Sequence, residues 1–149
     1  MTEAGISIAA DVVIDVHIDE VFEFVAEPLN DPRWCEKLIS VDQLDGDGPG
    51  PGAEYVVVHR PIPLRPARQM RFTCIDWDPP RRIVWREDDG HDVIDVVYEL
   101  EPVWTATRVT QRDTAWLGAP RWLRPLMKTG IRRDMRRQLR ALRRVLERG

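Results

Sequence analysis

A histidine and two other polar side chains fall on the predicted inner face of a β-sheet. Alternation places His59 on the same side of its strand as Tyr55, and it places Gln111 and Asp113 inward on a later strand. An imidazole oriented by a carboxylate can move a proton near neutral pH, as aldol and dehydration steps require. His59 with Asp113 or Gln111 is therefore a candidate acid–base set. No spacing forces these strands together, so a structural, hydrogen-bonded His59 is the alternative.

Two other features could suggest a functional site, but their sequence context argues against one. The loop GDGPGPG, residues 46–52, is glycine-rich, but a phosphate-binding loop needs Gly-Lys-Ser/Thr before a helix, and here Glu54 and Tyr55 begin a strand. Cys35 and Cys74 form no CxxC pattern, which favours unpaired buried thiols over a disulfide or a metal site. We therefore expect neither a cofactor nor a bound metal.

The elements that must position these residues follow from periodicity and turn signals. The pattern predicts a strand at 6–17, a helix at 19–30 capped by Asp19, a short helical turn at 32–38 and a strand at 39–44. After the glycine-rich loop, β-branched and aromatic runs predict strands at 52–61, 68–78, 81–88, 92–102 and 105–117. A long helix is predicted at 125–148.

The last helix is strongly amphipathic. Its apolar stripe comprises Ile131, Met135, Leu139, Leu142, Val145 and Leu146, whereas Arg132, Arg133, Arg136, Arg137, Arg140, Arg143 and Arg144 fill the other side. A continuous apolar stripe predicts that this helix covers a sheet and that its arginines face water. Nucleic-acid binding through these arginines is the alternative, which the formal net charge of −3 weakens.

The order of elements predicts one α+β domain over residues 1–149. A curved antiparallel sheet of about six to seven strands would wrap around the long C-terminal helix, with two short helices after the first strand. The first residues lack a basic leader, and no stretch reaches the roughly 18 apolar residues of a membrane span, so we expect a cytoplasmic protein. The sequence leaves monomer and homodimer open.

Four segments in this order resemble a known superfamily. They are VVIDVHIDEVFEFVAEPLNDPRW, GDGPGPG, DWDPPRRIVW and YELEPVWTATRVTQRD. Together they resemble the START-like, Bet v 1-type helix-grip superfamily, and specifically its bacterial polyketide cyclase/dehydrase-like (SRPBCC) proteins. The resemblance implies an elongated apolar cavity between sheet and helix, used for lipids, polyketides or other hydrophobic molecules. It does not imply one activity, since members include aromatase/cyclases, carriers and receptors.

The inward positions and the helix stripe together predict the residues that line such a cavity. They are Tyr55, His59, Phe72, Trp85, Val96, Tyr98, Gln111, Asp113, Met127, Ile131 and Met135. Met127 lies with Trp122 and Leu126 where the helix begins, and these side chains are a candidate gate. Two functions remain: binding or carrying a small hydrophobic molecule, or acting on one as a polyketide cyclase or dehydratase.

Overall fold

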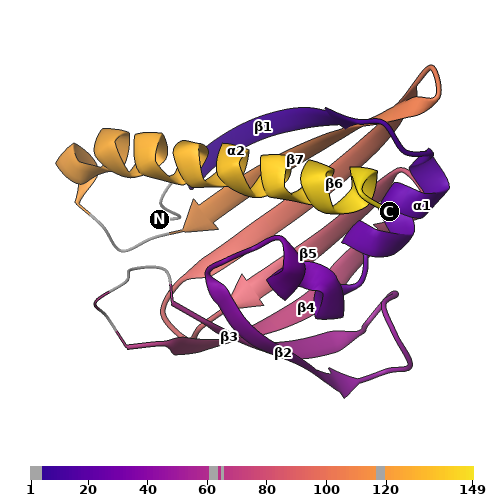
Figure 1. Ribbon diagram of the computed structural model, residues 1–149. Coiled ribbons are helices and arrows are strands. Elements are labelled where there is room, and N and C mark those ends of the chain that lie inside the picture. Colours follow the sequence, from indigo (N-terminus) through magenta and orange to yellow (C-terminus); the bar gives the residue numbers. More distant parts are fainter. Residues whose placement is uncertain (1–4, 61–63, 65, 117–119) are drawn as a thin grey trace.

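A computed structural model describes residues 5–60, 64, 66–116 and 120–149. Its strands are β1 (Ile6–Ile14), β2 (Leu38–Asp45), β3 (Glu54–His59), β4 (Arg68–Asp78), β5 (Arg82–Asp88), β6 (Val93–Val103) and β7 (Ala106–Trp116). They form one antiparallel seven-stranded sheet in the order β1-β7-β6-β5-β4-β3-β2. The helices are α1 (Ile18–Val25), α2 (Arg124–Glu147) and the short 3₁₀ segments η1 (Pro28–Arg33) and η2 (Arg121–Leu123). The predicted fold class is confirmed (Figure 1).

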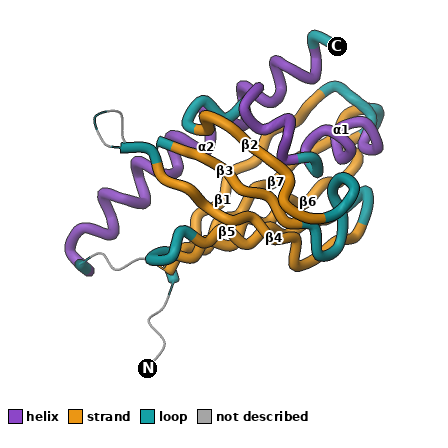
Figure 2. The backbone as a smooth tube through the Cα atoms, turned by 90° about the horizontal axis from the view of Figure 1, so that it is seen from below, coloured by secondary structure: helices purple, strands orange, loops and turns teal. Residues whose placement is uncertain are grey.

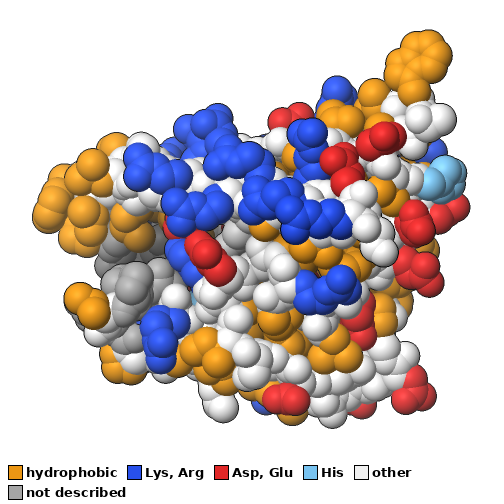
Figure 3. All heavy atoms as spheres, viewed as in Figure 1, with side chains coloured by type: hydrophobic (Ala, Val, Ile, Leu, Met, Phe, Trp, Pro, Cys, Tyr) orange, Lys and Arg blue, Asp and Glu red, His pale blue; other side chains and the backbone are white. Residues whose placement is uncertain are grey.

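Helix α2 lies across one face of the sheet, and its C-terminal end lies beside α1 (Figures 1 and 2). Its stripe residues Met135, Leu139 and Leu142 are buried, and it packs chiefly against β1. The arginines between these positions are exposed and form a basic band along the helix (Figure 3). The amphipathic pattern therefore predicted correctly which side of this helix faces the sheet.

The first helical segment differs from its prediction. β1 ends at Ile14, and the cap of α1 is His17, whose Nδ1 accepts a hydrogen bond from the backbone N–H of Asp19 at 3.3 Å. The predicted cap, Asp19, is already inside the helix. The α-helix stops at Val25, and residues from Pro28 onward form η1 instead, because proline removes a backbone donor and crowds the preceding turn.

The later strands match their predicted ranges closely, and β4 matches at both ends. Pro61 and Leu117, the last residues of two predicted strands, lie outside the described residues. Alternation along these strands sends Tyr55, Val57, Phe72 and Trp85 into the core, as the sequence indicates.

Candidate functional site

A cavity of about 220 Å³ lies between the concave face of the sheet, η1 with the segment after it, and α2. Its wall comprises Asp31, Cys35, Lys37, Leu38, His59, Met70, Phe72, Trp85, Glu87, Ile94, Val96, Tyr98, Gln111, Asp113, Ile131, Asp134, Met135 and Gln138. Apolar cavities of roughly 150 Å³ already bind benzene, so this space suits a molecule of one or two rings.

Most of the residues predicted from the sequence meet at this cavity. His59, Phe72, Trp85, Val96, Tyr98, Gln111, Asp113, Ile131 and Met135 line it. Tyr55 does not. It is fully buried, its ring lies 5.6 Å from that of Trp85, and its hydroxyl donates to Glu27 at 2.8 Å.

The start of α2 does not reach the cavity wall. Met127 does not line the cavity, although it was predicted to do so. The neighbouring Trp122 and Leu126, which the sequence suggested as parts of a gate, are 76% and 70% exposed.

The register of the central strands gathers the polar part of the wall around β6. Val96 lies opposite Trp85 of β5 and Asp113 of β7, and Tyr98 lies opposite Gln111. Paired residues of an antiparallel ladder point to the same face, so these side chains enter the cavity together.

Gln111, which is buried, and Asp113, which is half-buried, form a hydrogen-bonded pair on the cavity wall. The Gln111 amide Nε2 donates to Asp113 Oδ1 at 3.1 Å, whereas Gln111 Oε1 has no hydrogen-bond partner among the described residues. Burial raises the pKa of Asp113 to about 6, and the hydrogen bond from Gln111 opposes that rise. Asp113 can therefore exchange a proton near neutral pH.

Three further carboxyl groups on the wall were not predicted from the sequence: Asp134, which pairs with Lys37, and the carboxyls of Glu87 and Asp31. Burial raises the pKa of Glu87 well above its ordinary value, and the nearby charges of Asp113 and Asp31 raise it further. Burial raises the pKa of Asp31 well above its ordinary value, and the charge of Glu27 raises it further. Asp31 Oδ1 has no hydrogen-bond partner among the described residues. The indole of Trp34 acts in the opposite direction on Asp31.

Of Glu87 and Asp31, only Glu87 had a usable signal in the sequence. Glu87 follows Trp85 by two residues, so alternation alone points it inward. Glu87 was left out of the predicted cavity-lining residues because charged positions were assigned to the outer face of the sheet. Asp31 lies in a 3₁₀ segment that has no such period.

Cys35 and Tyr98 lie among three of the carboxyl groups on the wall. Burial raises the pKa of both side chains, and the charges of Asp31, Glu87 and Asp113 raise both further. Cys35 and Cys74 are free and buried, which confirms the expectation of unpaired thiols.

His59 lies apart from the polar pair. β3 is separated from β7 by three strands, and the ladder row of Asp113 crosses β4 at Cys74, whereas His59 lies opposite Arg68. Burial lowers the pKa of His59, and the charges that act on it are those of Asp89, Arg68 and Lys37. The predicted pairing of His59 with Asp113 or Gln111 is therefore absent from the described contacts, and His59 Nε2 has no hydrogen-bond partner among the described residues.

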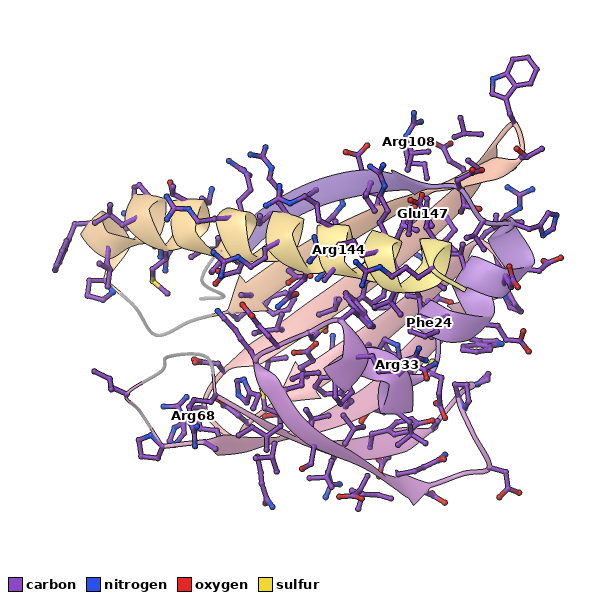
Figure 4. The ribbon with its side chains drawn as sticks, viewed as in Figure 1. Phe24, Arg33, Arg68, Arg108, Arg144 and Glu147 are labelled. Carbon is purple, nitrogen blue, oxygen red and sulfur yellow. The ribbon has the colours of Figure 1, made fainter. Side chains whose placement is uncertain are left out.

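Ion pairs connect the elements around the cavity. Lys37 donates to Asp134 of α2, which ties the segment after η1 to the helix. Arg68 at the start of β4 pairs with Asp89, which follows β5, at 3.1 Å, and Figure 4 shows Arg68 well away from α2. Outside the cavity, Arg33 of η1 lies 5.0 Å from the Phe24 ring centre, a cation–π contact that fixes η1 on α1 (Figure 4).

The described residues offer no metal site. No group of three or more histidine, cysteine, aspartate or glutamate side chains in residues 5–60, 64, 66–116 and 120–149 could hold a metal ion.

Residues 5–147 match the model of the family described as polyketide cyclase/dehydrase and lipid transport. The chain belongs to this family. No curated protein matches the chain. Within the described residues, no helix is both long and apolar enough to cross a membrane.

Solved structures share the fold at low sequence identity. The Zhui aromatase/cyclase from Streptomyces sp. R1128 is 16% identical with a TM-score of 0.79, over 97% of this chain and 94% of that one. The protein TTHA0849 from Thermus thermophilus is 15% identical with a TM-score of 0.77, over 93% and 95%. Ara h 8.0201 is 11% identical with a TM-score of 0.74, over 97% and 99%. These likenesses show that the chain has the same helix-grip fold as these proteins.

Proposed function

We propose that this protein binds one small, mainly apolar molecule in the cavity between the sheet and α2. The observation that carries this proposal is the cavity wall itself. Aromatic and aliphatic side chains form half of its 18 residues, and Gln111, Asp31 and His59 each add a buried polar atom without a partner among the described residues. Such a wall suits an apolar body with a few polar groups.

Binding of a neutral environment-sensitive dye, N-phenyl-1-naphthylamine, tests the proposal. We expect saturable fluorescence enhancement at one site per chain. Ile131→Trp should abolish it, because Ile131 lines the cavity and a larger ring would fill the space. Ile75→Trp is the matched control, since Ile75 is 46% exposed and is not on the cavity wall. Unchanged binding in Ile131→Trp would refute this location.

A second candidate is catalysis of cyclisation or dehydration in the same cavity. It is favoured by the pKa of Asp113, about 6, which lets this carboxyl accept and return a proton at neutral pH. In a dehydration, such a base would take a proton from carbon while the neighbouring hydroxyl leaves as water with a proton from a second acid. The raised pKa of Glu87 suits that second role.

Loss of one water from a β-hydroxy ketone model substrate, followed by mass spectrometry, tests this candidate. We expect Asp113→Asn to lower turnover by about a hundredfold or more, with dye affinity nearly unchanged. His59→Ala separates the two functions. If His59 is catalytic, the variant loses turnover. If His59 contacts the ligand, the variant binds the dye more weakly, and if it is only structural, the melting temperature alone falls. We expect the loss of affinity.

A further inference from the structure

The cavity has an excess of acidic groups. Asp31 from η1, Glu87 from β5 and Asp113 from β7 all line it. Its basic side chains do not balance them. Lys37 is already paired with Asp134, and burial favours the neutral form of His59.

The cavity also has buried acceptors that lack donors. Gln111 is 4% exposed, one N–H of its amide donates to Asp113, and its carbonyl oxygen has no hydrogen-bond partner among the described residues. Asp31 is 9% exposed, and its Oδ1 likewise has no hydrogen-bond partner among the described residues. A buried acceptor without a donor is unfavourable, so a ligand that donates hydrogen bonds would satisfy Gln111 Oε1, whereas Asp31 already has the Trp34 indole beside it.

We propose that the molecule bound here carries a protonated amine on an apolar body, an inference that rests on the proposed binding function. The ammonium group would donate to Gln111 Oε1 and to the carboxylates, while its apolar body packs on Phe72, Trp85 and Ile94. Burial and the neighbouring carboxyl groups raise the pKa of Asp31 and Glu87, which favours their neutral forms in the empty cavity. An ammonium group beside them lowers the pKa of both again, so its binding is coupled to release of protons and to attraction by the ionised carboxylates. An anionic ligand meets repulsion from the same groups.

Three naphthalenes with matched bodies test the charge preference by titration calorimetry at neutral pH. They are 1-naphthylmethylamine, which is cationic, 1-naphthylmethanol, which is neutral, and 1-naphthylacetate, which is anionic. We expect the amine to bind about tenfold or more tightly than the alcohol, and the acetate to bind most weakly. An alcohol that binds as tightly as the amine would overturn the inference and leave the proposed function standing. If none of the three binds, the proposed function fails with it.

Neutral variants locate the effect. Glu87→Gln and Asp113→Asn should each weaken amine binding about tenfold and leave binding of the alcohol nearly unchanged. The alcohol therefore reports whether the cavity keeps its shape. Asp42→Asn, the same change of charge at an exposed position of β2, should leave the affinity for the amine unchanged. Equal losses for amine and alcohol would overturn the inference, because they would indicate a damaged cavity and no charge recognition.

Discussion

Replacing Asp113 by asparagine should stabilise the folded protein at high pH and have little effect at low pH. In the folded state the pKa of Asp113 is about 6, against an ordinary value of 3.8. Between these values the folded state holds a proton that the unfolded chain has released, so stability falls as pH rises through this window. At about 1.4 kcal/mol for each pH unit, the full penalty above pH 6 is about 3 kcal/mol. Asparagine cannot ionise and keeps an oxygen for the Gln111 N–H group.

Urea denaturation of the wild type and Asp113→Asn at pH 4 and pH 8 measures this effect. We expect equal stability near pH 4 and a gain of up to about 3 kcal/mol for the variant near pH 8. Asp42→Asn, at an exposed position, should show almost no difference at either pH. A variant that loses stability at pH 8, or a difference that does not change with pH, would refute the argument that burial of a charged Asp113 is unfavourable.

Three shorter predictions concern the core. Leu139→Ala should lower the free energy of unfolding by about 2–5 kcal/mol, because Leu139 is 1% exposed on the side of α2 that faces the sheet. Arg140→Ala, at an exposed position of the same helix, should be nearly neutral. A loss below about half a kcal/mol for Leu139→Ala would mean that α2 is not docked on the sheet. Tyr55→Phe should cost about 1 kcal/mol, since it removes the hydrogen bond to Glu27, and equal denaturation midpoints would contradict this. The Cys35 thiol should react with iodoacetamide far more slowly than a free cysteine at pH 8, because burial raises its pKa; rapid alkylation in the folded state, read by mass spectrometry, would show that it is accessible.

The sequence predicted the fold because its signals are local and strong. Alternation in β4 to β7 and the apolar stripe of α2 each fix a buried side, and only a few topologies bury all of them together. The same alternation placed Phe72, Trp85 and Tyr98 toward the interior. It could not give their depth, and so Tyr55 points inward as predicted but lies outside the cavity wall.

The polar half of the site was harder to predict for two physical reasons. Glu87 breaks the rule that charged positions face water, because its half-buried side chain lines the cavity. Asp31 and Cys35 lie in and after η1, where the backbone has no regular period to assign a face. The distance between His59 and Asp113 depends on the order of the strands in the sheet. Alternation of apolar and polar residues assigns the face of each strand but does not predict that order.

The position of β1 at the edge of the sheet has a consequence for synthesis of the chain. β1 is made first, yet in the described sheet its one neighbour is β7, which ends at Trp116. Strands β3 to β7 can each pair as they leave the ribosome, because each lies beside the strand made just before it. β1 has no ladder partner during that time, and the side chains of Ile6 and Ile8 gain the cover of α2 only at the end. The nascent chain therefore presents an unpaired, apolar edge strand for most of its translation, which is the segment a chaperone would have to protect.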